Sequence, residues 1–332
     1  MQRFFILATL FAVGVVALLA SRVHAEQAGG LFPTGVPTLG GRFVWSDEVV
    51  DHGWRVQKNA VIGHYRLLDD HDRRQAFGSF DTCLAKLNEE KKAQNFPPNP
   101  KDVVIVLHGL GAGRQFMEGL AEYLEENGNL ATINVGYPST MEDVDAYAAS
   151  LDSVIRHLDG VERVSFVAHS MGNIVIRRYL NNMSRLDPAM RPPVEFKRMV
   201  MISPPNHGAE LADAWADNKL VETVAGKPLE QLAPSKGWPE LEKQLSTPDF
   251  PFGIIVGGRG DAEGYFDAIP GDDDGLLSIE TSKLAGASDY IQTLGIHQLM
   301  PQYKEVRAAA LNFLLHGYFV SPQAMHPIVA AK

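Results

Sequence analysis

The stretch FVAHSMGNIVI at residues 166–176 decides the fold, because an apolar run stops at a serine between small residues before a helical pattern resumes. The same alternation repeats along the chain. Apolar runs lie at 103–107, 133–137, 164–168 and 199–202, and segments with helical spacing lie at 114–126, 141–158 and 170–181. Continuous β-branched strands that alternate with amphipathic helices indicate a parallel sheet covered on both faces. We therefore predict a mostly parallel, doubly wound α/β sheet.

The pattern extends over one domain, which we place at residues 42–320. Strands at 252–256 and 290–294 and a helix at 301–316 complete it. Between the fourth and fifth parallel strands, residues 206–251 are partly helical and contain five prolines, so we predict a small helical cap inserted over the carboxyl edge of the sheet. Residues 26–41 are rich in Gly and Pro and predict an extended linker, and residues 321–332 a C-terminal tail.

Short strand-like runs between residues 41 and 69 predict antiparallel strands, and 80–93 predicts a helix. We expect these N-terminal strands to extend the parallel sheet.

The first 25 residues predict a secretory signal. An uncharged apolar run from Phe4 to Ala20 follows Arg3, and Val23 and Ala25 suit a signal peptidase site. The alternative is an uncleaved membrane anchor, because the run approaches the shortest span that crosses a bilayer. We favour export to the periplasm or the extracellular space. Cys83 is the only cysteine, so no intrachain disulfide can form there.

The composition is that of a globular protein, with 45% hydrophobic and 21% charged residues. A formal net charge of −10 and the lack of a long basic cluster argue against a nucleic-acid partner, because phosphate binding needs clustered Lys and Arg.

Ser170 stands where a parallel strand ends and a helix begins, which is where reactive groups gather in such sheets. Its neighbours at minus two and plus two, Ala168 and Gly172, are small and permit a tight turn that exposes the hydroxyl. The alternative is that Ser170 only caps the helix. As a nucleophile it would need a histidine base and a carboxylate to orient that histidine.

His297 is the best candidate for the base, because it lies in the loop before the last helix. The other histidines after Ser170 lie too early or in the final helix and tail; they are His207, His316 and His326. For the acid, the run at 272–274 offers three candidates and Asp261 offers another. A solvated turn, or a calcium site made from Asp272 and Asp273, are alternatives for this run. Otherwise we expect no cofactor or metal.

The segment Leu107–Gly111, with sequence LHGLG, follows the first parallel strand. Backbone N–H groups at such a turn can stabilise the negative charge that develops on a carbonyl oxygen during acyl transfer. Alone, the segment is more typical of a plain glycine turn at the end of a strand.

Together these motifs resemble the α/β-hydrolases of the bacterial lipase/esterase type, over about residues 101–316. AHSMG at 168–172 resembles the nucleophile elbow, with Ala in place of the first Gly. DGLLS at 274–278 resembles the segment that holds the acid, and on that resemblance we choose Asp274, with Asp261 as the second candidate. HGLG at 108–111 resembles the oxyanion segment, and the resemblance implies that Leu110 and Met171 supply the two oxyanion N–H groups. PNHG at 205–208 departs from a lipase turn, so His207 receives no role.

The resemblance implies an α/β-hydrolase fold and an exported serine hydrolase that cleaves carboxylic esters, with lipid or acylglycerol esters as substrates and transient contact with a lipid surface. An acyltransferase or an amidase would use the same triad, and a non-catalytic binding module on the same scaffold is a further alternative. Apolar residues in 206–251 allow either a mobile lid or a cap packed permanently on the core. The oligomeric state is not indicated.

Overall fold

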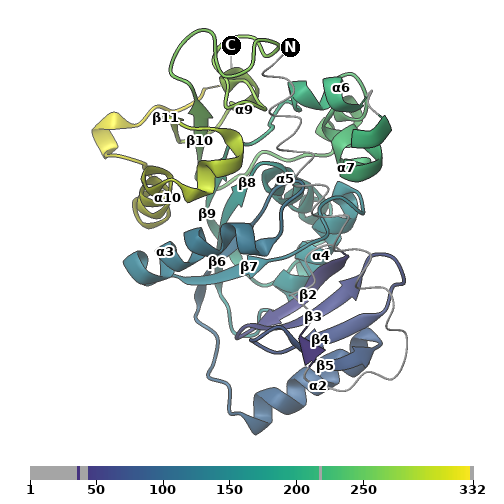
Figure 1. The fold of residues 1–332 in the computed structure, drawn as a ribbon. Coiled ribbons are helices and arrows are strands. Elements are labelled where there is room, and N and C mark those ends of the chain that lie inside the picture. Colours follow the sequence, from purple (N-terminus) through teal and green to yellow (C-terminus); the bar gives the residue numbers. More distant parts are fainter. Residues whose placement is uncertain (1–35, 38–43, 217–218, 330–332) are drawn as a thin grey trace.

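The computed structural model describes residues 36–37, 44–216 and 219–329, without the side chains of 36–37 and 214–225 (Figure 1). The proposed signal at 1–25, and the linker except for residues 36–37, lie outside the described residues. Among the described residues, no helix has both the length and the apolar character needed to cross a bilayer.

Six parallel strands form the central sheet, in the order β11-β10-β9-β8-β6-β7. In chain order they are β6 (Asp102–Leu107), β7 (Ala131–Val135), β8 (Arg163–His169), β9 (Glu195–Ile202), β10 (Phe252–Gly258) and β11 (Asp289–Leu294). This order, with a helix after most strands, is the α/β-hydrolase fold that the sequence predicts.

Helices cover both faces of this sheet. Neighbouring residues of a strand point to opposite faces, so each strand contributes side chains to both layers of helices. Val104 and Val106 face the cluster that includes α3 (Glu118–Gly128) and α10 (Lys304–His316). Ile105 and Leu107 face the larger cluster that includes α4 (Val144–Arg156) and α5 (Met171–Ser184). Both clusters are closed to solvent, as continuous apolar strands require.

The N-terminal strands form a sheet of their own, so the expectation that they extend the parallel sheet is wrong. The order is β1-β5-β4-β3-β2, with antiparallel pairing throughout. The strands are β1 (Val36–Pro37), β2 (Trp45–Asp51), β3 (Trp54–Asn59), β4 (Tyr65–Leu68) and β5 (Arg73–Gly78), and α2 (Phe80–Ala93) follows them. Short hairpin connections join β2, β3, β4 and β5, so each of these strands pairs with the next. Helix α2 covers their apolar face with the buried side chains of Cys83 and Leu87. This accessory sheet lies at the bottom of Figure 1.

The insertion between β9 and β10 contains α6 (Glu210–Ala216), α7 (Lys219–Leu232) and α8 (Trp238–Glu242). Gly226 breaks α7, and a Cβ there would lie 2.2 Å from the Thr140 carbonyl oxygen. The second half of the insertion is part of the main core through five buried side chains, namely Leu229, Leu232, Ala233, Trp238 and Leu241. This half of the insertion is therefore packed on the sheet domain.

Short helices connect the remaining elements. They are η2 (Arg114–Met117), η3 (Pro188–Met190), α9 (Ile279–Ser282), η4 (His297–Gln302) and η5 (Pro322–Ala324). The segment after α10 returns to the start of β11, where Asp289 accepts hydrogen bonds from the backbone N–H groups of Phe319 and His326.

Gly253 in β10 is predicted to tolerate no larger residue. A Cβ at this position would lie 2.5 Å from Phe313 of α10 and 2.6 Å from Phe319. Because overpacking of a filled core destabilises by about 1–3 kcal/mol, Gly253→Ala should lower the free energy of unfolding by that amount in a urea titration. An unchanged transition midpoint would contradict this packing.

Candidate active site

Ser170 occupies a strained backbone conformation between β8 and α5. Its φ of 53° and ψ of −128° lie in a region that non-glycine residues rarely adopt. Its side chain makes no capping hydrogen bond to α5. The structure therefore does not support the alternative in which Ser170 only caps the helix.

Close approach of two chain segments accommodates this turn. A Cβ on Gly172 would lie 2.7 Å from the carbonyl oxygen of His108, and a Cβ on Gly109 would lie 2.8 Å from the Cβ of Ser170. Both glycines are needed because backbone packs on backbone here. Ala168, the departure from the usual motif, is a buried strand residue with 0% exposure.

The structure brings Ser170, His297 and Asp274 together. Ser170 Oγ lies 2.8 Å from His297 Nε2, and His297 Nδ1 lies 2.7 Å from Asp274 Oδ2. A carboxylate only accepts, so Nδ1 carries the proton that is donated to Asp274 and Nε2 is left to accept from the Ser170 hydroxyl. His297 and Asp274 are buried, with exposures of 4% and 1%.

Asp274 is held in place by the backbone. Its Oδ1 accepts from the N–H groups of Leu277 and Leu276, at 2.9 and 3.1 Å. Its carbonyl oxygen also accepts from the N–H of His297 at 2.8 Å. The acid and the base are thus joined by a backbone bond as well as a side-chain bond, which limits their relative movement.

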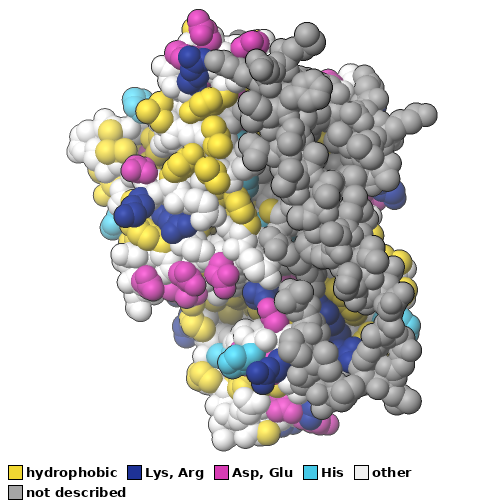
Figure 2. Space-filling view, in the orientation of Figure 1, with side chains coloured by type: hydrophobic (Ala, Val, Ile, Leu, Met, Phe, Trp, Pro, Cys, Tyr) yellow, Lys and Arg dark blue, Asp and Glu magenta, His cyan; other side chains and the backbone are white. Residues whose placement is uncertain are grey.

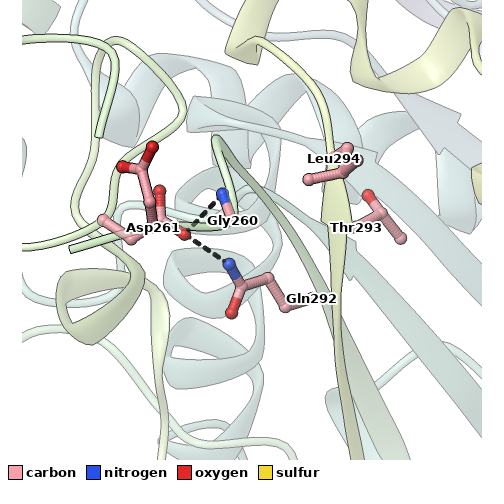
Figure 3. A pocket seen from close by; sticks show the side chains of 6 residues that line it. Gly260, Asp261, Gln292, Thr293 and Leu294 are labelled. Carbon is pink, nitrogen blue, oxygen red and sulfur yellow. Dashed lines mark hydrogen bonds between the residues drawn. The ribbon is translucent and has the colours of Figure 1, made fainter. Parts of the chain in front are cut away.

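Asp261, the second candidate for the acid, serves its own turn. It pairs with Arg259 at 2.9 Å and accepts from the N–H groups of Glu263 and Gly264. Its side chain is 41% exposed and lines a hollow beside β11 rather than approaching His297 (Figure 3).

The neighbouring aspartates are also occupied by hydrogen-bond donors. Asp272 accepts from the N–H groups of Arg259 and Gly260 and from the Gln292 amide. The buried Asp273 accepts from Phe266 N and Gly275 N, and burial raises its pKa. The Gly260 N–H and the Gln292 amide donate to the same oxygen, Asp272 Oδ2. Donors thus surround both carboxylates that the calcium alternative would use.

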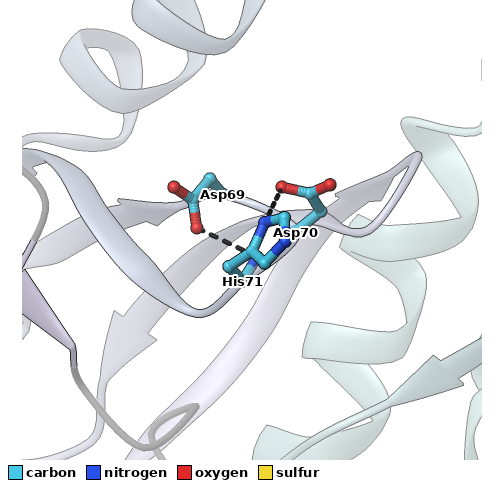
Figure 4. Close-up of side chains that lie close together, drawn as sticks. All are labelled: Asp69, Asp70 and His71. Carbon is cyan, nitrogen blue, oxygen red and sulfur yellow. Dashed lines mark hydrogen bonds and ion pairs between the residues drawn. The ribbon is translucent and has the colours of Figure 1, made fainter.

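One group of possible metal ligands is found among the described residues, in the turn between β4 and β5 of the accessory sheet. Asp69, Asp70 and His71 lie close together there (Figure 4). Asp69 accepts from the N–H groups of His71 and Arg73, and Asp70 contacts the ring of His71 at 2.8 Å. These bonds describe an exposed turn on the accessory sheet, separate from Ser170.

The oxyanion segment lies against the nucleophile. Gly109 lies so close to Ser170 that a Cβ at position 109 would be 2.8 Å from the Ser170 Cβ. His108 Nδ1 donates to the Gly109 carbonyl oxygen at 2.9 Å. Among the described residues, the N–H groups of Leu110 and Met171 have no hydrogen-bond partner. Two free N–H groups on segments that flank the serine can act as donors to an oxyanion.

His169 was not singled out by the sequence analysis. Its Nε2 donates to the carbonyl oxygen of His297 at 2.9 Å, so the residue directly before Ser170 contacts the loop that carries His297. Burial lowers the pKa of His169 well below its ordinary value, and the nearby His297 and His108 act in the same direction. His169 is therefore a neutral donor. A neutral buried histidine leaves no charge pattern by which the sequence could show it.

His207 lies away from the site, as its lack of a role requires. Its ring is 52% exposed and faces Glu242 at 3.2 Å. The preceding Asn206 is buried and contacts Arg177 of α5 at 3.0 Å and the Ser282 carbonyl at 2.9 Å. These contacts fix the turn that follows β9.

A family model matches part of the chain. Residues 97–208 match a family described as "Putative serine esterase (DUF676)". The matched segment runs from before β6 to the turn after β9. It therefore contains His108 and Ser170 but neither Asp274 nor His297. Together, the match and the geometry support an ester hydrolase.

Solved structures with similar backbones include a Bacillus licheniformis lipase, BlEst2, at 18% identity, covering 69% of this chain and 95% of that one with a TM-score of 0.48. The phospholipase PlaB of Legionella pneumophila matches at 16% identity, covering 66% of this chain and 57% of that one with a TM-score of 0.46. A Staphylococcus hyicus lipase matches at 12% identity, covering 61% of this chain and 89% of that one with a TM-score of 0.44. All three TM-scores lie below 0.5, so these likenesses bear on neither substrate nor mechanism. No curated protein matches the chain.

His169 should make folding stability depend on pH. Its pKa is lower in the folded state than in the unfolded state, so below about pH 6.5 the unfolded chain binds a proton that the folded chain does not. Stability contributed by the neutral ring is present above that pH and is lost as the pH falls, by up to about 1.4 kcal/mol per pH unit.

Urea titrations at pH 7.5 and 5.5 would test this with wild type and His169→Gln, which keeps a donor but does not titrate. The wild type should lose more stability between the two pH values than the variant. Equal losses would contradict a neutral His169.

Proposed function

We propose that this chain is an exported serine hydrolase that cleaves carboxylic esters, with lipid or acylglycerol esters as its substrates. The observation that carries the proposal is the pair of hydrogen bonds that links Asp274 to His297 and His297 to Ser170. A hydroxyl is a poor nucleophile at neutral pH unless an adjacent base removes its proton.

In the proposed mechanism, Ser170 Oγ attacks the ester carbonyl carbon while His297 Nε2 takes the hydroxyl proton. Asp274 stabilises the resulting imidazolium through its bond to Nδ1. The tetrahedral intermediate then collapses, and His297 donates that proton to the departing alcohol. This leaves an acyl group on Ser170. Water, deprotonated by His297, attacks the acyl carbon and releases the carboxylic acid and the free serine.

The N–H groups of Leu110 and Met171 are the proposed donors to the oxyanion. Each such donor lowers the barrier by about 3 kcal/mol in acyl-transfer enzymes. The mechanism needs no metal or cofactor, because the three side chains and these two N–H groups supply the nucleophile, the proton transfers and the charge stabilisation.

Apolar residues in the loop of the proposed base support the choice of lipid esters. Leu299 lies two residues after His297 and is 43% exposed. Phe116 and Leu276 are partly buried on the neighbouring segments. Hydrophobic side chains also gather on the upper half of the face seen in Figure 2. Such surface favours an apolar acyl chain or a lipid surface over a charged substrate.

Export is supported by the N-terminal sequence and by the state of the single thiol. Cys83 is fully buried in the core of the accessory sheet, and burial raises its pKa to about 11. A protonated, buried thiol resists oxidation, which suits an oxidising compartment.

We also propose that the middle of the insertion acts as a lid. The two ends of the insertion are held: Glu210 at the start of α6 accepts from the Ser278 hydroxyl at 2.6 Å, and Leu211 packs with Phe266 and Ile269. The later part, including Trp238, belongs to the main core. In a lid, these two anchors would act as the hinges.

Ester hydrolysis should depend on all three side chains. With p-nitrophenyl esters of increasing chain length, Ser170→Ala and His297→Ala should lower kcat by about 10⁴–10⁶, and Asp274→Asn by about 10⁴. Rates should rise from acetyl to longer acyl chains if lipids are the substrates.

The matched control is Asp261→Asn, which changes the same type of residue in the same region and should leave kcat within about twofold. Faster hydrolysis of the matching p-nitroanilide would instead indicate an amidase. Wild-type activity in Ser170→Ala would refute the proposal.

A lid predicts dependence on the physical state of the substrate. The rate on a long-chain ester should rise more steeply above the solubility limit of the ester than below it, because a lipid surface favours the open state. A single saturation curve through the solubility limit would indicate a permanently packed cap.

A further inference from the structure

The accessory sheet contacts the turn that follows β7. β2 lies beside the end of β7, and Asp47 of β2 binds both polar backbone groups of Gly136. The Asp47 N–H donates to the Gly136 carbonyl at 2.9 Å, and the Gly136 N–H donates to Asp47 Oδ2 at 2.7 Å. Asp47 is fully buried, with 0% exposure.

Buried donors fix the Asp47 side chain. Arg55 Nη1 donates to Oδ2 at 2.5 Å, and Gln57 Nε2 donates to Oδ1 at 2.7 Å. Arg55 also reaches across to the carbonyl of Asn134 in β7 at 3.1 Å. The register of β2 against β3 shifts between Asp47 and Val49, and such a bulge redirects the side chains beside it.

Tyr137, which follows Gly136, holds His108. The Tyr137 N–H donates to His108 Nε2 at 3.3 Å, and the Tyr137 hydroxyl donates to the His108 carbonyl oxygen. The two rings are stacked, with centroids 4.2 Å apart and an angle of 12° between the planes. His108 is therefore fixed at its ring and at its backbone.

His108 in turn orients one particular peptide. Because Nε2 accepts from Tyr137, Nδ1 carries the proton, which it donates to the Gly109 carbonyl oxygen at 2.9 Å. That carbonyl belongs to the same planar trans peptide as the Leu110 N–H, so the two groups point in opposite directions. The same carbonyl also accepts from the Ala112 N–H at 3.4 Å, so His108, at 2.9 Å, makes the shorter of the two bonds that set the direction of the Leu110 N–H.

We propose that the accessory sheet is a brace for the oxyanion segment, with Asp47 and Tyr137 as positioning residues that act through His108 on the Leu110 N–H. The proposal rests on the proposed function of Leu110 and Ser170. It gives the accessory sheet a part in catalysis although none of its residues touches the substrate.

A second contact supports this brace. Arg114, which begins η2 just after the oxyanion segment, pairs with Asp72 in the turn between β4 and β5 at 2.5 Å. The Arg114 carbonyl accepts from the Asn134 amide at 2.8 Å. The segment 108–114 is thus held at its end by Asp72 of the accessory sheet, and at its start by Tyr137, which follows the Gly136 that Asp47 binds.

The test uses two variants of the full chain, each with a matched control. Tyr137→Phe removes the hydroxyl bond to His108 and keeps the stacked ring. Its control is Tyr179→Phe, because the Tyr179 hydroxyl is buried and has no partner among the described residues. Asp47→Asn is matched by Asp289→Asn, because Asp289 is equally buried and also accepts from backbone N–H groups, at the far end of β11.

A misdirected oxyanion donor lowers kcat and leaves substrate binding unchanged. Complete loss of one donor lowers kcat by about 10²–10³, so we expect a smaller fall of about 10-fold in Tyr137→Phe and Asp47→Asn, with KM within about twofold of wild type. An alkylboronic acid, which mimics the tetrahedral intermediate, should bind more weakly by the same factor. Both control variants should keep the wild-type kcat.

Hydrogen exchange gives a readout that does not depend on activity. Peptides that cover residues 108–112 should exchange faster in Asp47→Asn than in wild type or Asp289→Asn. Wild-type kcat and wild-type exchange in both test variants would overturn the brace, and so would equal losses of kcat in the test and control variants. If the wild type shows no hydrolysis that depends on Ser170, the proposed function fails, and the exchange data alone decide whether the accessory sheet supports this segment.

Discussion

The strained backbone at Ser170 is the constraint on which the rest of the site depends. A non-glycine residue at φ 53° and ψ −128° is unfavourable by about 1–3 kcal/mol, and it persists only where the surrounding structure determines it. That structure is the contact between the start of α5 and the end of β6, where Gly172 and Gly109 leave room for nothing larger than hydrogen. The turn projects the hydroxyl from the carboxyl edge of the sheet, toward His297. A relaxed turn would remove the hydroxyl from the base even if all three side chains were present.

Around this turn, each reacting group is fixed by backbone contacts rather than by its own side chain alone. Asp274 is held by two N–H groups of its loop and is joined to His297 through the main chain as well as through the ring. His169 holds the carbonyl of His297 from the residue next to the nucleophile. His108 does the same for the peptide of Leu110. Short, buried hydrogen bonds of this kind keep the groups in place, so little reorganisation is needed when charge develops.

Much of this arrangement could be predicted from the sequence. The alternation of apolar strands and helices predicts the parallel sheet, and the order of Ser170, Asp274 and His297 along the chain places them at one edge. The choice between Asp274 and Asp261 could not be made from residue type alone, because it depends on which loop turns inward. The sequence predicts the wrong sheet for the N-terminal strands. A period of two shows that a segment is a strand, but it does not show which strand that segment pairs with. His169 and Asp47 act through contacts between distant segments, and such contacts leave no local pattern.

The central claim is that Ser170 is an activated nucleophile, and covalent labelling tests it most directly. The folded protein would be treated with a fluorophosphonate, and the modified peptide would be identified by mass spectrometry, for wild type and for His297→Ala. We expect one adduct, on Ser170, in the wild type, and much slower labelling without the imidazole. Absence of an adduct on Ser170 in the folded protein, or equal labelling rates in the two proteins, would contradict the claim.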